Sequence, residues 1–489
     1  MTKDVKVFTY ETRIPNDPFI EDALRAFGEL YGEMERSLFQ ELTGKTNHHI
    51  NEIKTNFLGC FGVTARQFNG CLKLLQGKIE SVKESMLRRV VEIQERIENL
   101  SKKISRIRDP FVKHQKKRNL QKNVDTLHNL EKDLNEGVIS LCFGGKKLFS
   151  AQFYLKENGY ASFGKWKKDW QEARSSEFYC IGSKDETAGN QTCVLTLSSE
   201  GEGTLQLRLP DSLLGEFGKH LIIPIVFPKY GRSEIFKALG HKQALSYRFK
   251  KDKKGWRVFV TFEQARAPIS TKGHIGSIGI DINVNHIALV ETDLHGNPIE
   301  KKTYPLCTYG KSQDQAKALI GDVVKQIVDF AKEKQKPIVR EKLEFRKKKA
   351  QMREDSKKRA RMLSSFHYST FIENLESKAF REGILVHAVN PAMTSIIGKI
   401  KFAVRYGLTI HHGAALVIAR RHTQFSEAPS RCPMKVVHKQ FHVTCPLPER
   451  NRGEHVWKVW GRINKKLKAA LAARSRTSLA PQAKACAAG

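Results

Sequence analysis

The sequence has no long hydrophobic run, since nowhere do 18 apolar residues follow one another. Neither end carries a signal-peptide pattern or a lipidation motif. These absences argue against a membrane-spanning, secreted or lipid-anchored protein. We therefore expect a soluble protein of the cytoplasm that makes no membrane contact.

The nine cysteines form no CxxC pair, and even the two that lie closest in the sequence, Cys60 and Cys71, are well separated. An odd number of scattered cysteines favours reduced thiols over a disulfide framework. The sequence also lacks a GxGxxG motif and the phosphate-binding motif GxxxxGK[ST]. Their absence argues against an NTP-driven helicase.

Negative charge is scarce, because 85 Lys and Arg face only 51 Asp and Glu, which gives a net charge of +34. A positive field of this size predicts a polyanion as partner. The 489 residues, 40% of them hydrophobic, are enough for the buried cores of several domains.

The first half of the chain alternates between strand and helix patterns. Residues 5–14 (VKVFTYETRI) have the period of a strand, whereas the stretch from 19 to 135 is helical, with a hairpin turn predicted near Asp109 because Pro110 interrupts it. Residues 138–265 carry the β-type runs TCVLTLSSE, TLQLRLP, HLIIPIVF, ALSYRFKK and WRVFVTFEQ. We predict an antiparallel, wedge-like β domain from residues 1–18 and 138–265, with residues 19–137 inserted as a helical recognition domain.

A basic tract, SKKISRIRDPFVKHQKKRNLQKN, crosses the predicted hairpin turn. Most charge runs are solvated helix faces, but this one has a single sign, which favours contact with phosphates. The candidate nucleic-acid-binding residues of this tract are Lys102, Lys103, Arg106, Arg108, Lys116, Lys117 and Arg118.

The second half begins with a buried strand, IGSIGIDIN, followed by a hairpin, a helix from about 312 to 334 and the strand PIVREKLEF. This is the order in which the RNase H fold begins, and a helix, the strand ILVHAVNP and the helix HHGAALVIARRH follow. We predict an α/β domain over 276–425, a basic C-terminal region over 426–476 and a disordered tail over 477–489. The whole chain is then an α+β multidomain protein.

Two acidic residues follow apolar strand segments, Asp281 after GSIGI and Glu341 in PIVRE. Phosphodiester hydrolysis with two metal ions needs carboxylates at the ends of neighbouring strands, where both can bind the same divalent ions. The alternative is that each acid has a structural role, such as capping a turn.

Three segments resemble the RuvC core of TnpB-type nucleases, which are relatives of type V CRISPR effectors: GIDIN, IVREKLEF and HYSTFIENLESKAFREGILVHAVNPAMTS. Upstream, ARQFNGCLKLLQGKIES and CFGGKKLFSAQF are similar to the TnpB-related accessory branch. The resemblance implies an RNA-guided DNA endonuclease, with Asp281 and Glu341 as catalytic, metal-binding residues and Mg²⁺ as cofactor, for which Mn²⁺ can substitute. It also implies a monomeric protein in a ribonucleoprotein with a guide noncoding RNA, and a double-stranded DNA target beside a short motif. Such a protein works in the prokaryotic cytoplasm and is nucleoid-associated when bound to DNA.

The sequence departs from the family pattern at the third acidic position, where HHGAA places His411. Imidazole can bind a divalent ion, so the predicted catalytic and metal-binding set is Asp281, Glu341 and His411. If His411 and His412 instead contact solvent or phosphate, the protein is a nuclease-dead RNA-guided repressor or accessory factor. An RNase H-fold transposase is a further alternative.

The family's four-cysteine zinc ribbon is missing, since IIGKIKFAVRYGLTI follows Thr394 and Ser395 without a cysteine. Cys432, His438, His442 and Cys445 have the spacing C-x5-H-x3-H-x2-C, which matches no zinc module, so we predict no zinc site. A second basic segment follows Glu341 and is expected to guide a single strand towards the metals. Its candidate residues are Arg346, Lys347, Lys348, Lys349, Lys357, Lys358, Arg359 and Arg361.

Overall fold

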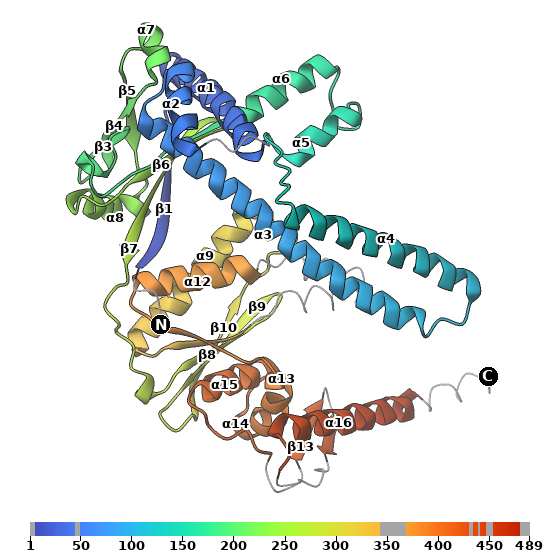
Figure 1. Ribbon diagram of the computed structural model, residues 1–489. Helices are drawn as coiled ribbons and strands as arrows, with labels where there is room; N and C mark the ends of the chain where they lie inside the picture. Colours follow the sequence, from blue (N-terminus) through green and yellow to red (C-terminus); the bar gives the residue numbers. More distant parts are fainter. Residues whose placement is uncertain are drawn as a thin grey trace, which may run out of the picture. The chain divides into compact units, whose positions relative to one another are not determined.

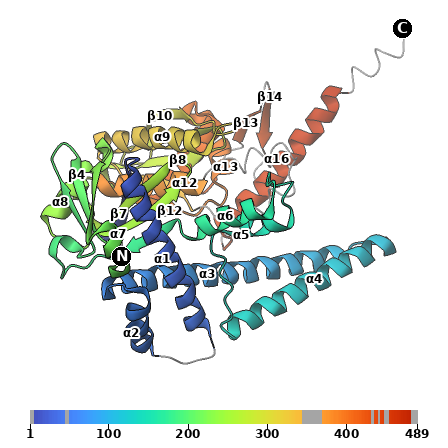
Figure 2. The same cartoon turned by 90° about the horizontal axis from the view of Figure 1, so that it is seen from above.

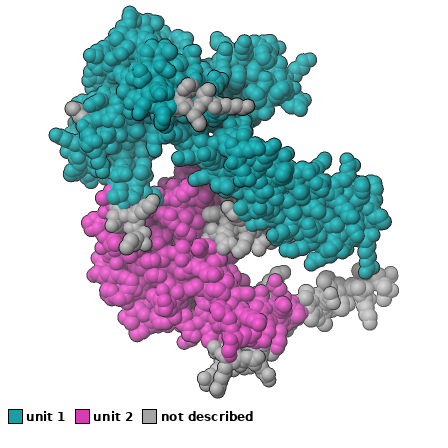
Figure 3. Space-filling model, in the orientation of Figure 1, with its two compact units in different colours: residues 1–264 teal, residues 265–489 magenta. Residues whose placement is uncertain are grey.

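The computed structural model describes residues 5–44, 49–342, 368–429, 434–438, 441–445 and 453–479, with backbone only over 434–445 and 471–479. The chain forms two compact units, unit 1 (Met1–Gln264) and unit 2 (Ala265–Gly489), coloured separately in Figure 3. The protein is mixed α+β with several sheets, as the sequence predicts. Within the described ranges, every helix is too short or too polar to cross a bilayer.

Unit 1 contains two sheets. The four-stranded sheet has the order β1-β7-β6-β2, and its strands are β1 (Val5–Arg13), β2 (Glu177–Cys180), β6 (Ser246–Asp252) and β7 (Gly255–Ala265). The three-stranded sheet is antiparallel and has the order β3 (Cys193–Leu197), β4 (Glu202–Arg208), β5 (His220–Val226). The five β-type runs of the sequence correspond to β3 to β7.

The helices of unit 1 begin at recognisable caps. Asp17 precedes Pro18 and accepts a hydrogen bond from the Ile20 amide at 2.9 Å, and Thr64 forms a capping box with Gln67. The helices are α1 (Pro18–Thr43), α2 (Ile50–Phe61), α3 (Ala65–Ile104), α4 (Pro110–Asn135), α5 (Lys146–Ser150), α6 (Phe163–Arg174), α7 (Leu214–Phe217) and α8 (Lys229–Gly240).

The helices α3 and α4 lie side by side as a long hairpin (Figure 1; Figure 2). Asp109 caps α4 by accepting from the amides of Phe111 and Val112 at 2.8 and 3.0 Å, and Pro110 occupies the first helical turn. The predicted turn near Asp109 is therefore confirmed.

Residues 138–265 are not built of strands alone, because α5, α6, α7 and α8 lie within this range. The helix α6 begins at Ser162, whose hydroxyl accepts from the Lys165 amide, and it buries Trp166. The strands of this region begin only at Glu177. The predicted β domain therefore contains helices as well as strands, and the sequence analysis did not identify α6.

The core of unit 1 joins both sheets to α1, α2 and α3. Phe178 of β2 stacks on Phe27 of α1 with ring centroids 4.4 Å apart and on Phe249 of β6 at 4.5 Å. Aromatic burial of this kind holds the helices on the four-stranded sheet.

Unit 2 is built on a five-stranded sheet with the order β10-β9-β8-β11-β12. The strands β8, β9 and β10 form an antiparallel meander, whereas β11 runs parallel to β8 and to β12. Their bounds are β8 (Ile278–Ile282), β9 (His286–Thr292), β10 (Pro298–Pro305), β11 (Ile338–Glu341) and β12 (Val386–Val389).

Helices cover both faces of this sheet. One core cluster combines Ile278 and Ile280 of β8 with α9 (Gln313–Lys334) and α12 (Tyr368–Arg381). The other combines Val290 of β9 with α15 (Ile410–His422) and α16 (Val456–Leu479). Since side chains alternate along a strand, Gly279 and Asp281 of β8 lie on the opposite face of the sheet, which faces α15. A Cβ atom at Gly279 would overlap the Ala415 carbonyl oxygen, so α15 lies directly on the strand.

Between β12 and α15 the chain forms α13 (Thr394–Ile397), the π-helix η5 (Gly398–Ala403) and α14 (Val404–Tyr406). This segment occupies the place at which the family pattern carries a zinc ribbon. Gly398 of η5 and Gly413 of α15 touch through their backbones, so α15 is also closely packed on this side.

The strands β13 (Met434–His438) and β14 (Phe441–Cys445) pair antiparallel before α16. Helix α16 includes residues 477–479 of the predicted tail, and 480–489 lie outside the described residues. The candidate zinc residues also lie outside the described side chains: Cys432, His438, His442 and Cys445.

Candidate active site

Asp281 and Glu341 lie at equivalent points of two neighbouring parallel strands. The pairing of β11 with β8 ends with Arg340 opposite Ile280, and Glu341 and Asp281 are the next residues along their strands. Paired residues of parallel strands point to the same face of the sheet. The two carboxylates therefore belong to one side of the sheet, the side that faces α15.

Asp281 is buried, with 7% of its surface exposed, and its carboxylate accepts two hydrogen bonds through the same oxygen. Asn283 Nδ2 donates to Asp281 Oδ2 at 2.9 Å, and His411 Nδ1 lies 3.1 Å from that oxygen. His411 is the second residue of α15, and 47% of its side chain is exposed. With Nδ1 directed at the carboxylate, the other ring nitrogen, Nε2, is the one presented to a ligand or a proton.

The carboxylate of Glu341 is oriented by Thr394, whose hydroxyl donates to Oε1 at 2.7 Å. Tyr368, the first residue of α12, lies in the electric field of both acids. Burial, together with the charges of Asp281 and Glu341, raises the pKa of the Tyr368 phenol to about 12.

Two further histidines surround His411. The ring of His286, at the start of β9, meets the His411 ring edge-on with centroids 4.8 Å apart, and burial followed by the charge of His411 lowers its pKa. His412 points inward instead: Nδ1 lies 2.8 Å from the Thr409 hydroxyl and Nε2 lies 3.1 Å from the Lys302 carbonyl oxygen. Burial lowers the pKa of His412, whereas 47% of the His411 side chain is exposed.

The donor set fits a hard divalent cation by its chemistry. Carboxylate oxygens are the preferred ligands of Mg²⁺, and an added imidazole makes Mn²⁺ more favourable. In the described part of the chain, however, no three His, Cys, Asp or Glu side chains lie close enough to form a ready-made metal cluster. Asp281 and His411 are in contact, and Glu341 lies at the equivalent point of the adjacent strand.

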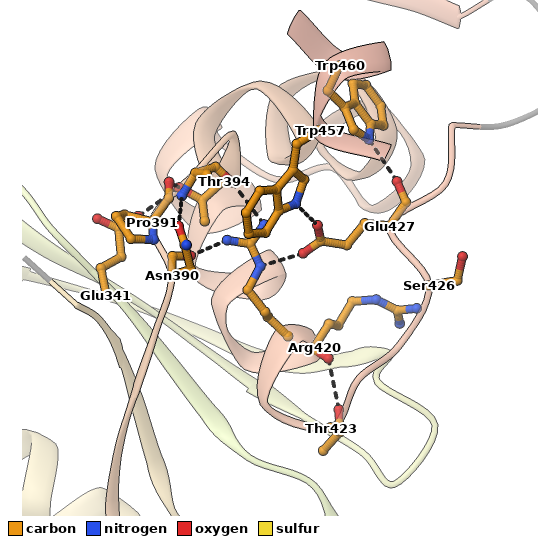
Figure 4. A network of polar contacts seen from close by, with 12 residues as sticks. Glu341, Asn390, Pro391, Thr394, Arg420, Thr423, Ser426, Glu427, Trp457 and Trp460 are labelled. Carbon is orange, nitrogen blue, oxygen red and sulfur yellow. Dashed lines mark hydrogen bonds and ion pairs between the residues drawn. The ribbon is translucent and has the colours of Figure 1, made fainter. Parts of the chain in front are cut away.

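A polar network fixes the loop that carries Thr394 (Figure 4). Arg421 donates to the carbonyl oxygens of Asn390 and Ala392, and its Nε lies 2.5 Å from Glu427 Oε1. Glu427 in turn accepts from Trp457 Nε1 on its carboxylate and from Trp460 Nε1 on its carbonyl oxygen, both at 2.8 Å. The helix α16 is thereby joined, through one arginine, to the loop that positions Glu341.

The predicted nucleic-acid-binding residues fall into two groups. All seven of the hairpin are exposed, at the end of α3, in the turn and in α4. Among the residues that the structure describes, only Lys102 of the seven has an ion-pair partner, Glu98 of its own helix at 3.7 Å. The eight residues from Arg346 to Arg361 lie outside the described residues. A pocket of about 590 Å³ between α3 and α4 adds Arg88, Arg89 and Arg96 to the basic surface of the hairpin.

Sequence reasoning did not single out four residues near the acidic site. Asn283, His286 and Thr394 contact Asp281, His411 and Glu341 respectively, and the pKa of Tyr368 is raised in part by the two acids. Asn283 follows Asp281 by two residues within the GIDIN segment, and Thr394 lies in the NPAMTS segment. Both motifs carried a signal that could have identified these residues. His286 and Tyr368 become neighbours of the acids only through the fold.

Comparison with known proteins gives structural matches and no sequence matches. No family model matches the chain, and no curated protein matches it. T. thermophilus RuvC in complex with a Holliday junction substrate is 18% identical over 31% of this chain and 93% of its own, with a TM-score of 0.22. A Cas12f1–sgRNA–target DNA complex is 12% identical over 86% and 99% with a TM-score of 0.24, and a CRISPR-Cas12f ternary complex is 10% identical over 85% and 98% with a TM-score of 0.23.

Proposed function

We propose that the chain is an RNA-guided DNA endonuclease, which binds a noncoding guide RNA and cleaves complementary double-stranded DNA beside a short motif. The observation that carries the proposal is the pairing of Asp281 and Glu341 at equivalent points of neighbouring parallel strands, with His411 in contact with Asp281. The strand order supports it, because an antiparallel meander followed by parallel strands with crossover helices is the topology of an RNase H-like (RuvC) domain.

In this proposal Asp281 and Glu341 hold Mg²⁺ or Mn²⁺, and His411 adds its Nε2 nitrogen. The cation supplies activation of water and stabilisation of the leaving oxygen when it is bound. Thr394 keeps the Glu341 carboxylate turned towards the site, and Asn283 does the same for Asp281. The burial of Asp281 keeps bulk water from competing with these contacts.

The charge of the chain favours the same partners. A net charge of +34 and an exposed basic hairpin suit a guide RNA and its heteroduplex with DNA, recognised through the phosphate backbone. We assign residues 1–18 and 138–265 to a wedge-like domain, 19–137 to recognition and 276–425 to the nuclease. We further propose that one protein copy acts in a ribonucleoprotein, in the prokaryotic cytoplasm and on the nucleoid.

A second candidate is an RNA-guided DNA-binding protein that does not cut. It is supported by His411 at the position of the family's third acid and by the lack of a three-ligand cluster among the described residues. Both candidates bind RNA and a matched DNA, so they differ only in the chemistry at the carboxylates.

The test is cleavage of a matched DNA by the complex reconstituted from the full chain and its copurified RNA, in Mg²⁺ and in Mn²⁺. We expect metal-dependent cleavage that falls on the order of a thousandfold in Asp281→Ala and in Glu341→Ala, with target binding retained. His411→Ala should cut more slowly. Tight target binding by the wild type with both strands intact in either metal would favour the second candidate, and recovery of cutting in His411→Asp would then identify the missing acid as the cause.

A further inference from the structure

Unit 1 contains a cavity of about 410 Å³ that is distinct from the acidic site of unit 2. Its walls come from α1, from the segment before α5, and from α5 and α6. The volume is in the range of pockets that hold one small organic ligand.

The lining of the cavity is cationic and contains no acid. Arg36, Lys146 and Arg174 line it, and no Asp or Glu does. Neither arginine forms an ion pair within the described part of the chain, and the buried atoms Arg36 Nη1 and Arg174 Nε have no hydrogen-bond acceptor there. Burial lowers the pKa of both arginines, and the charge of Arg36 lowers that of Arg174 further. The charges of Glu33 and Glu35 raise the pKa of Arg36 and offset part of this effect. Two guanidinium groups that line one cavity and form no ion pair with a described residue favour the binding of an anion.

The same cavity has aromatic walls. Phe143, Phe149 and Trp170 line it, and the guanidinium carbon of Arg174 lies 3.8 Å from the centre of the Trp170 ring. Trp170 is itself stacked on Trp166 with centroids 5.3 Å apart, and Trp166 Nε1 donates to the Leu148 carbonyl oxygen at 2.8 Å, which fixes α6 to α5. The ring of Phe149 remains 40% exposed, so one aromatic face is open to a ligand.

A glycine pair makes this arrangement possible. Gly144 has φ +82°, and a Cβ atom there would come within 3.1 Å of Arg174 Cγ and 3.2 Å of Trp170 Cδ1. The segment CFGGKK therefore passes directly against the arginine and the tryptophan, and it brings Phe143 and Lys146 into the cavity on either side of the glycines.

We propose that this cavity binds one unpaired nucleotide of the RNA that the protein carries, with the base stacked on Phe149 beside the edge of Trp170 and the phosphate on Arg36, Lys146 and Arg174. The ligand must be both planar and anionic, which a nucleotide is, and bases of single-stranded RNA are commonly stacked on aromatic rings and guanidinium planes. The hydroxyls of Ser140 and Ser150, which also line the cavity, suit a ribose 2′-hydroxyl and favour RNA over DNA. The inference rests on the proposed function for the identity of the polymer.

The experiment measures the affinity of the full-length protein for a short unstructured RNA and for the DNA of the same sequence. Arg36→Gln, Arg174→Gln and Phe149→Leu are compared with Lys167→Gln, which removes an exposed charge from the same helix α6 outside the cavity. We expect each cavity variant to weaken RNA binding about tenfold, and the control about twofold. A loss in the cavity variants no larger than that in Lys167→Gln would overturn the proposal, and a loss confined to DNA would overturn the assignment to RNA.

Two further readouts make the result independent of folding. Arg36→Gln should unfold at a temperature no lower than the wild type, because it removes a cation that forms no ion pair with any described residue; a marked drop would mean a structural role. Ultraviolet crosslinking should attach bases to the peptides that contain Phe149 or Trp170, and adducts only elsewhere would contradict the proposal. If the cavity variants bind RNA more weakly but the wild type does not cleave DNA, the nuclease proposal alone is refuted. If the wild type cleaves DNA but the cavity variants bind RNA normally, the nucleotide-binding proposal alone is refuted.

Discussion

A buried lysine of unit 2 and two half-buried arginines of unit 1 differ in whether they have an acidic partner. In unit 2, Lys336 donates to Glu291 Oε1 at 2.6 Å and to the Thr292 carbonyl oxygen at 2.8 Å, and both side chains of the pair are over 90% buried, with exposed fractions of 7% and 5%. In unit 1, Arg36 and Arg174 line a cavity and have no carboxylate partner in the described residues.

This difference in pairing distinguishes a charge that stabilises the fold from charges that, in our proposal, bind a ligand. A paired buried charge is costly to break, because its partner is left uncompensated. An unpaired cation beside a cavity lowers the free energy of unfolding when no anion is bound. Proteins commonly tolerate such a loss of stability at binding sites. Mutations that test each class should therefore move stability in different directions.

The largest effect is expected at the Lys336–Glu291 pair. Lys336→Met should destabilise the protein by about 3–5 kcal/mol, because it leaves Glu291 buried and uncompensated. The double variant Lys336→Met, Glu291→Leu should recover most of this loss. Urea unfolding of the two variants and of Glu291→Leu measures the coupling, and additive losses would show that the pair has no structural role.

A smaller effect is expected at Glu427, which joins α16 to the loop near Glu341. Glu427→Ala removes an acceptor from Arg421 and another from Trp457, and should cost about 2 kcal/mol. Glu427→Gln keeps one acceptor oxygen and should cost less. If the link serves the site, DNA cleavage falls along the same series while RNA binding stays constant; unchanged cleavage in Glu427→Ala would limit the network to stability.

The next prediction concerns the hydrogen bond between Thr394 and Glu341. Thr394→Val removes the hydroxyl that donates to Glu341 at 2.7 Å, and should cost about 1 kcal/mol of stability and slow cleavage about tenfold. Thr394→Ser retains the hydroxyl and should cut nearly as well as the wild type. Equal rates for the valine and serine variants would mean that Glu341 does not depend on this hydrogen bond.

The smallest effect is a loss of stability in acid. The rings of His387 and His422 stack with centroids 4.1 Å apart, and burial lowers the pKa of both below the ordinary 6.5. Each ring binds a proton near pH 6.5 in the unfolded chain but only at a lower pH in the folded chain. The contribution of the neutral rings to the free energy of unfolding is therefore fully present above pH 6.5 and is lost as the pH falls below it. Unfolding temperatures between about pH 8 and pH 5.5 measure the slope. His422→Phe should flatten it, and an unchanged slope would exclude the stacked pair as its source.

Much of the architecture follows from local patterns. Strand alternation identified β3 to β7, Asp109 with Pro110 marked the hairpin turn, and Ser312 begins α9 with a capping box, close to the predicted start at residue 312. Each of these signals lies within a few residues, so the sequence carries it directly. The short helix α6 was missed because one cap and one buried tryptophan give no periodic pattern.

The contacts that define the sites could not be predicted from the sequence. Thr394 reaches Glu341 across 53 residues of sequence, and Asp281 reaches His411 across 130. The cavity of unit 1 combines Arg36 with residues from 140 to 174, and in the sequence Arg36 is an ordinary charged residue of an amphipathic helix. Such partners are selected by packing, which local propensity does not encode.

The close packing of α15 has a consequence for how this protein could change. Gly279 lets the helix lie on β8, and Gly413 lets it lie on η5, so the start of the helix has little freedom to move. A substitution at position 411 therefore leaves the backbone in place, so the new side chain occupies the same position beside Asp281. A histidine codon becomes an aspartate codon by a single nucleotide substitution. The two functions proposed for this chain, binding alone and binding with cleavage, thus lie one mutational step apart on an unchanged scaffold, and a population could pass between them in either direction.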